Sequence, residues 1–375
     1  MIPMFKVAVA EGASAAAAEV LSSGMLGEGP KVAELTDRLR PIFQTENVIL
    51  LNSCTSAITM ALRLFGIGHG SKVLTTPFTM VATSCAIAAT GAEPVWCDID
   101  DETLSFYVRD LKNKLPGKDA LVMTLVGGLP PLEMDLISIH TQCRKLGIPF
   151  IIDGAHALAT YIQGNHVSNY CDAFCASFQA IKHLTTGGDG GALVLNSDTE
   201  EHFLNKAERL KWFGLSRQIP EGKTRLEHQM TQDVPDWGYK FHMNDVAAAI
   251  GLANFDLAFQ NIAMSTRNAL RLNALLEEVE QVQGPRVEFP ETSSWWAYPL
   301  LVKRRDELLL HLEEKGITST PMWRRNDRYS AFKPSPTRLR GMDKVEKEIL
   351  FVPNGFWVSL SECDFIAETI KDFYK

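Results

Sequence analysis

The segment Ser177-Phe-Gln-Ala-Ile-Lys182-His-Leu-Thr-Thr-Gly187 follows an apolar run and leads directly into a glycine cluster at 187–191. A lysine alone is usually a solvated charge, and a glycine cluster alone is usually a flexible turn. A lysine at a strand end among apolar neighbours is different, because desolvation lowers its pKa and favours the nucleophilic amine. The pattern makes Lys182 a candidate Schiff-base lysine.

The apolar run that precedes this one also ends on a charged residue. It reads Pro149-Phe-Ile-Ile-Asp153 and continues Gly-Ala-His156. Taken alone, Asp153 could be a base, a metal ligand, a charge partner or a helix cap. Together with Lys182 it suits pyridoxal phosphate (PLP), which needs a lysine for the Schiff base and an acid that keeps the pyridine nitrogen protonated. We therefore predict that Lys182 and Asp153 are catalytic and hold opposite ends of one ring.

The sequence around these two segments is typical of an α/β protein. From residue 46 to about 197, short apolar or β-branched runs alternate with helical stretches, which favours a mainly parallel sheet between helices. Seven strands are expected, at 48–52, 72–76, 94–98, 120–125, 149–153, 173–178 and 191–195. Helices are expected between them at 56–65, 79–89 and 136–146.

The pattern changes after residue 197. Longer helices are expected at 199–212, 243–254 and 261–279, followed by a Gly284-Pro285 break, a strand at 296–302 and helices at 307–315 and 361–373. We predict a large domain over residues 1–255, including the N-terminal segment, and a smaller α+β domain over 256–375.

Composition excludes several classes of protein. The chain has 375 residues, 46% hydrophobic and 22% charged, with a formal net charge of −8, which argues against a dedicated nucleic-acid binder. No apolar run is expected to reach membrane-spanning length, and no signal peptide is recognised, so a cytoplasmic location is expected. The seven cysteines suit reduced thiols. Cys171 and Cys175 with His166 lack a second ligand pair, which disfavours a metal site.

A third segment offers a place for the cofactor's phosphate. Asn52-Ser53-Cys54-Thr55-Ser56-Ala57 joins a strand end to a helix N-terminus, where unpaired N–H groups and the helix dipole bind anions. Ser177 could supply another hydroxyl. Taken alone, Thr55 and Ser56 could equally be a plain helix cap.

These segments together resemble the DegT/DnrJ/EryC1/StrS family of PLP-dependent aminotransferases, which aminate nucleotide-linked ketosugars. The resemblance implies PLP-dependent transferase fold type I, a phosphate role for Thr55, Ser56 and Ser177, and a contact of His156 near the ring's phenolic oxygen. It also implies a homodimer with a shared active site. A branch that replaces the lysine by histidine and dehydrates sugars is disfavoured, because Lys182 is intact.

Some positions depart from the family pattern. Met80 stands where an aromatic residue often stacks on the cofactor, and a thioether can still lie against a ring. Lys240 replaces an Asn that reaches the phosphate of the neighbouring subunit's cofactor, and it still suits a phosphate. The glycine run is one residue longer than usual. The stretch 321–329 contains a tryptophan and three arginines that could bind an anionic or aromatic substrate, or form a solvated loop.

The predicted function is therefore a PLP-dependent aminotransferase. It would move an amino group from an amino acid, glutamate or glutamine by family analogy, to a keto acceptor such as a nucleotide-linked ketosugar. One alternative is a PLP-dependent decarboxylase, lyase or isomerase acting on an amino acid, because the same cofactor serves all these reactions. A second alternative is a non-catalytic regulatory protein that retains the fold.

Overall fold

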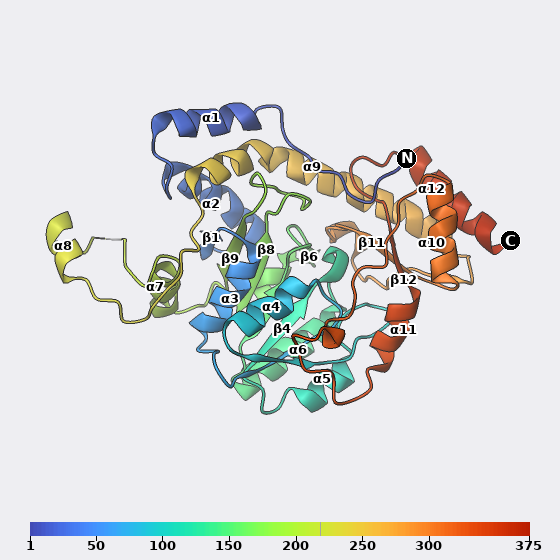
Figure 1. The fold of residues 1–375 in the computed structure, drawn as a ribbon, viewed down its shortest axis with the longest axis horizontal. Helices are drawn as coiled ribbons and strands as arrows, with labels where there is room; N and C mark the ends of the chain where they lie inside the picture. Colours follow the sequence, from blue (N-terminus) through green and yellow to red (C-terminus); the bar gives the residue numbers. More distant parts are fainter. Residues whose placement is uncertain (218) are drawn as a thin grey trace.

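The computed structural model describes residues 1–217 and 219–375. A seven-stranded sheet lies at its centre, in the order β1-β9-β8-β5-β4-β2-β3 (Figure 1). β9 runs antiparallel to both its neighbours, and the strands from β8 to β3 are parallel to one another. The strands are β1 (Val48–Leu51), β2 (Lys72–Thr75), β3 (Glu93–Trp96), β4 (Ala120–Thr124), β5 (Phe150–Asp153), β8 (Ala173–Ser177) and β9 (Gly191–Leu195).

The prediction of an α/β fold with a mainly parallel seven-stranded sheet is confirmed. All seven predicted strands are present, with bounds shifted by no more than two residues. The reason is that most of these strands are buried on both faces, so they read as unbroken apolar runs, as in Val48–Leu51 and Ala120–Thr124.

Helices cover both faces of the large sheet. Side chains of α3, α4 and α7 share one buried cluster with Ile49 and Ile151. Side chains of α2, α5, α6 and α9 share another with Leu50 and Ile152 on the opposite face. The helices are α1 (Ala13–Ser23), α2 (Pro30–Phe43), α3 (Cys54–Leu64), α4 (Val81–Ala89), α5 (Val108–Lys114), α6 (Glu133–Leu146), α7 (Glu201–Leu210), α8 (Arg225–Thr231) and α9 (Asp245–Leu276).

A small antiparallel sheet completes the fold near the C-terminus. It pairs β10 (Val282–Gln283), β11 (Tyr298–Val302) and β12 (Ile349–Val352), and α10 (Arg305–Glu314) and α12 (Leu360–Tyr374) share its core. A further helix, α11 (Arg340–Glu348), contacts β11. A hairpin of β6 (Tyr161–Ile162) and β7 (Asn165–His166) lies between β5 and β8 in sequence, and α8 projects away from the body (Figure 1).

The helix α9 corrects the sequence-based expectation at one point. Two helices were expected at 243–254 and 261–279, but α9 is continuous over 32 residues. The residues between the two expected helices contain no Pro or Gly, and Phe255 and Ala258 are buried, so nothing breaks the helix there. The predicted domain boundary at 255/256 falls within α9, whose later residues Ala269 and Leu272 belong to the core of the small sheet. The division into domains stays a prediction.

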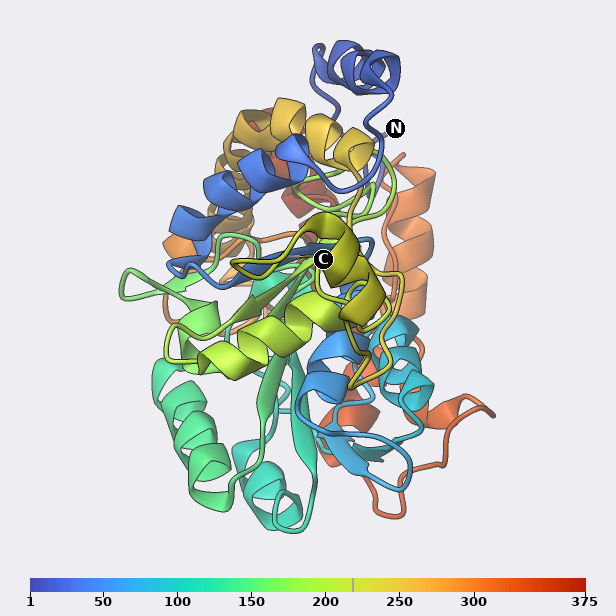
Figure 2. The ribbon, with the colours of Figure 1, turned by 90° about the vertical axis from the view of Figure 1, so that its left-hand side faces the viewer.

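By length and composition α9 could also cross a membrane, contrary to the expectation that no segment reaches such an apolar length. It packs on α1 and α2 near one end and on α12 near the other (Figure 1), and Figure 2 shows α9 lying between α1 and α2. These contacts bury part of its apolar surface, including Phe255, Ala258 and Leu272. At its first residue, the buried Asp245 accepts hydrogen bonds from the N–H groups of Gly29, Lys31 and Val32, which fixes the start of α2.

Candidate active site

The carboxyl ends of three neighbouring parallel strands open into one cavity of about 390 Å³. Thr124, Asp153 and Ser177 are the last residues of β4, β5 and β8, and all three line this cavity. The N-terminus of α3, the start of α4 and the loop after β8 form its walls. The cavity therefore lies where an open α/β sheet binds its ligands.

Lys182 lies half-buried in the loop after β8 and lines the cavity. Its Nζ is 3.7 Å from the centroid of the Trp296 ring. Burial lowers the pKa of Lys182 to about 8, against the opposing effects of the Asp153 carboxylate and Cys54. An amine with this pKa is partly neutral near physiological pH, so Lys182 has the protonation behaviour that a nucleophilic lysine needs.

Asp153 is 5% exposed and lines the same cavity as Lys182. Burial raises the pKa of Asp153, while hydrogen bonds from Thr83 and Ala155 and the charge of Lys182 act in the opposite direction. The structure thus brings together the two residues that the sequence singled out, although they are 29 positions apart in the chain.

His156 is buried and lies nearly parallel to two tryptophan rings. The ring centroids of His156 and Trp296 are 3.9 Å apart at 4°, and those of His156 and Trp323 are 5.6 Å apart at 13°. Burial, reinforced by Lys182 and His183, holds the pKa of His156 well below its usual value. Its Nδ1 has no hydrogen-bond partner within the part of the chain that the structure describes. Such a nitrogen is suited to a polar ligand atom.

The hydroxyl groups near the start of α3 divide into two kinds. Ser53 caps the helix by accepting a hydrogen bond from the Ser56 N–H at 3.0 Å, and Ser53 and Thr55 line the cavity. Ser56 does not line it, and its hydroxyl donates to Asn52 Oδ1 at 2.7 Å. The first amides of a helix have no intrahelical acceptor, so the start of α3 can bind an anion. The phosphate roles of Thr55, Ser56 and Ser177 stay predictions.

Gly191 explains part of the glycine cluster. A Cβ at this first residue of β9 would lie 2.5 Å from the backbone nitrogen of Cys54 and 2.7 Å from the carbonyl oxygen of Ala176. Only glycine therefore lets the start of α3 approach the sheet this closely.

Met80 and Lys240 occupy different surroundings. Met80 lines the cavity and is 48% exposed, and its Sδ accepts a hydrogen bond from the Ala82 N–H at 3.0 Å. Lys240 does not line the cavity of its own chain: its Nζ lies 5.7 Å from the centroid of the Trp212 ring. Stacking by Met80 and a phosphate contact by Lys240 in a second chain both stay predictions.

In the stretch 321–329, the tryptophan and the buried arginine have different surroundings. Trp323 lines the cavity. Arg325 is 4% exposed and donates to both oxygens of Asp327, at 2.7 and 2.8 Å, and to Asp343 at 2.7 Å. Arg325 therefore stabilises the fold, and the arginines of this stretch do not line the cavity.

The comparisons with known proteins agree with this site. A family model described as the DegT/DnrJ/EryC1/StrS aminotransferase family matches residues 8–371. The chain belongs to this family. The sugar aminotransferase CalS13 from Micromonospora echinospora has a crystal structure with a TM-score of 0.91, 30% identity and coverage of 99% of this chain and 100% of that one. The crystal structure of AtS13 from Actinomadura melliaura also has a TM-score of 0.91. It is 32% identical, and the match covers 99% of this chain and 98% of that one.

A sugar aminotransferase of known name is also similar in sequence. It is the dTDP-4-dehydro-2,3,6-trideoxy-D-glucose 4-aminotransferase of Saccharopolyspora spinosa, 30% identical over 311 residues, which are 80% of this chain and 78% of the relative. The predictions of fold type I and of an aminotransferase are thereby confirmed. Members of this family are PLP-dependent.

The cavity fits this cofactor. It offers an amine of lowered pKa, a buried carboxylate, an unpartnered imidazole nitrogen and a helix N-terminus with hydroxyl groups, and PLP needs a partner of each kind. Lys182, Asp153, His156 and Thr55 are the residues that would hold it.

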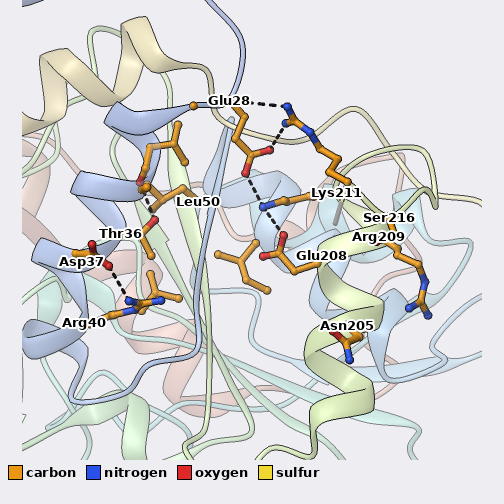
Figure 3. A pocket seen from close by; sticks show the side chains of 16 residues that line it. Glu28, Thr36, Asp37, Arg40, Leu50, Asn205, Glu208, Arg209, Lys211 and Ser216 are labelled. Carbon is orange, nitrogen blue, oxygen red and sulfur yellow. Dashed lines mark hydrogen bonds and ion pairs between the residues drawn. The ribbon is translucent and has the colours of Figure 1, made fainter. Parts of the chain in front are cut away.

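A larger hollow of about 560 Å³ lies elsewhere, between α2, β1 and α7 (Figure 3). Several of its charges are paired with one another: Lys211 forms ion pairs with Glu28 and Glu208, each at 2.6 Å, and Arg40 forms one with Asp37 at 2.6 Å. It shares no lining residue with the Lys182 cavity. Its greater size therefore does not make it the active site of this aminotransferase.

Several lining residues were missed from the sequence. Phe5 and Trp296 stack with ring centroids 4.8 Å apart although they are far apart in the chain, and both line the cavity with Trp323 and Gln179. Gln179 lies inside the quoted lysine segment, so its position was the available signal. Phe5 and Trp296 carry no local pattern that distinguishes a site residue from a core residue.

Proposed function

We propose that this chain binds PLP in the Lys182 cavity and transfers an amino group from glutamate or glutamine to the keto group of a nucleotide-linked sugar. The observation that carries the proposal is that Lys182 and Asp153 line one cavity with the hydroxyl-bearing start of α3. Bound there, PLP would supply an electron sink for the substrate's Cα. The printed activity of the Saccharopolyspora spinosa relative supports the class of acceptor.

Each of these residues would have its own role toward the cofactor. Lys182 would hold the cofactor through Nζ and, once the donor displaces it, carry a proton at the substrate's Cα, for which a pKa of about 8 is well matched. Asp153 would hold the proton of the pyridine nitrogen, and His156 would contact the phenolic oxygen. Thr55 and Ser177, which line the cavity, would contact the phosphate, Ser56 would support the helix start behind them, and Met80 would lie beside the ring.

The charges of the cavity favour a shared site. Lys182 is the only lysine or arginine that lines it in the described part of the chain, although the cofactor phosphate and the donor's carboxylates are anionic. A second chain could supply the missing cation, and Lys240 is our candidate. We therefore propose a homodimer in which Lys240 of each chain reaches the partner's phosphate site.

The donor half-reaction tests the activity without an acceptor. Purified, PLP-loaded protein is mixed with single amino acids, and the absorbance of the bound cofactor is followed. Glutamate or glutamine should convert it to pyridoxamine phosphate, and Lys182→Ala should not. No conversion with any donor would contradict the proposal, and carbon dioxide released without an acceptor would favour the decarboxylase alternative.

The acceptor and the shared site need separate measurements. Candidate ketosugar nucleotides and simple keto acids are incubated with the amino form of the protein, and aminated products are read by mass spectrometry. For the shared site, Lys182→Ala and Lys240→Ala proteins are unfolded, mixed and refolded together. If each site takes Lys240 from the other chain, mixed dimers contain one intact site and recover about a quarter of wild-type activity. No recovery over the separate variants would contradict sharing.

A further inference from the structure

The buried carboxylate of Asp153 is held by donors from three elements. On one oxygen, Oδ1 accepts from the Ala155 N–H at 3.2 Å and lies 3.8 Å from the Cys54 thiol. On the other, Oδ2 accepts from the Thr83 hydroxyl at 2.6 Å, the shortest of these contacts. An anion this deeply buried depends on such donors, because it has lost its water.

Two further threonines continue from Thr83 along the wall of the cavity. Thr79 Oγ1 is 2.8 Å from Thr83 Oγ1, and Thr124 Oγ1 is 3.1 Å from Thr79 Oγ1. They come from the first turn of α4, the segment before it and the end of β4, and all three are buried. The three threonines are not placed together by their spacing in the sequence. They meet because α4 packs against β4 and β5.

The hydroxyl protons of this chain can point in only one direction while Asp153 is ionised. Thr83 has one proton and donates it to the carboxylate, so the bond between Thr79 and Thr83 must be donated by Thr79. Thr124 then donates to Thr79. Three hydroxyl dipoles thus point toward one carboxylate, and each polarises the next.

We propose that Thr83, supported by Thr79 and Thr124, is a positioning residue that keeps Asp153 ionised and oriented toward the cofactor's pyridine nitrogen. The inference rests on the proposed cofactor role of Asp153. A valine at position 83 would keep the shape of threonine but leave Oδ2 without its donor and Thr79 without its acceptor.

Other groups around Asp153 also affect the ionisation of its carboxylate. Lys182 favours the ionised carboxylate, and the thiols of Cys54 and Cys175 lie close by with pKa values raised by burial. Burial raises the pKa of Asp153 itself, and the Thr83 hydrogen bond is the largest effect that opposes it. Loss of that bond therefore favours protonation of Asp153.

The first experiment reads the pyridine nitrogen directly. Wild type, Thr83→Val and Thr83→Ser are loaded with PLP that carries ¹⁵N in its ring, and the nitrogen resonance is followed against pH. The ring should lose its proton at a lower pH in Thr83→Val than in wild type, and Thr83→Ser should follow wild type. The donor half-reaction should slow about tenfold in the valine variant, as expected for one hydrogen bond to a charge. Equal spectra for valine and wild type, or an equal shift for serine and valine, would overturn the proposal.

A second experiment uses cofactor-free protein, so it does not depend on the proposed function. Urea unfolding of Thr83→Val and Thr83→Ser is compared between pH 4 and 8. Because the valine variant raises the folded-state pKa of Asp153 further, its deficit should grow as pH rises and Asp153 ionises. A constant deficit would refute the role of Thr83. If wild type failed to hold PLP while this deficit grew, the cofactor proposal would fail and the hydroxyl chain would stand.

Discussion

Replacing Lys182 by Met should stabilise the cofactor-free protein at neutral pH. The two side chains have similar length, but only lysine brings a charge into the cavity. Burial lowers the pKa of Lys182 from 10.5 to about 8 in the folded state, so protonating it there is penalised. The gap between these values corresponds to about 3 kcal/mol, which is the largest gain in unfolding free energy that we expect at pH 7.

The stability gain of Lys182→Met should depend on pH. The penalty is complete below about pH 8, where the folded protein must hold a proton on Lys182, and it fades as pH rises toward 10.5, because the unfolded chain then loses the proton too. Urea unfolding at pH 7 and pH 10.5, at one protein concentration, measures both limits. Lys347→Met, on the exposed face of α11, is the matched control. A Lys182→Met protein no more stable than this control at pH 7, or a gain that persists at pH 10.5, would refute the desolvation of Lys182.

Three further predictions concern Asp153, Trp296 and Arg325. Asp153→Asn should slow the donor half-reaction at least about a hundredfold while PLP still binds, measured in single turnovers, and an unchanged rate would exclude Asp153 as the ring-nitrogen partner. Trp296→Leu should let water reach Lys182 and raise its pKa from about 8, so that PLP capture by the cofactor-free protein requires a higher pH, whereas Trp296→Phe should resemble wild type. Arg325→Met should lower the unfolding free energy by about 3 kcal/mol, because Asp327 would stay buried without its partner, and the absorbance of bound PLP should not change.

The large sheet and the positions of Lys182 and Asp153, the two residues that we propose as catalytic, were predictable because local sequence determines them. Strands buried on both faces appear as apolar runs, and a charged residue at the end of such a run, as at Asp153 or shortly after Ser177, lies at the edge of the sheet where ligands bind. Gly191 was visible as part of a cluster, although the close approach of Cys54 that requires it was not.

The rest of the site depends on tertiary packing. Phe5 reaches the cavity from the N-terminal segment, and Trp296 from just before β11. The expected break in α9 at 255–260 does not exist, because Phe255 and Ala258 pack in the same core as Ala248 and Ile262. Ser56 was grouped with Thr55 because both are hydroxyl residues at a helix start, but only Thr55 faces the cavity. Neighbouring positions on a helix point in different directions.

The most direct test of the account is to identify the residue that holds the cofactor. PLP-loaded protein is reduced with borohydride, digested and analysed by mass spectrometry. We predict one added pyridoxyl phosphate group, on the peptide that contains Lys182, and none in Lys182→Ala. A label on another lysine, or no label on a protein whose absorbance shows bound PLP, would contradict the assignment of Lys182.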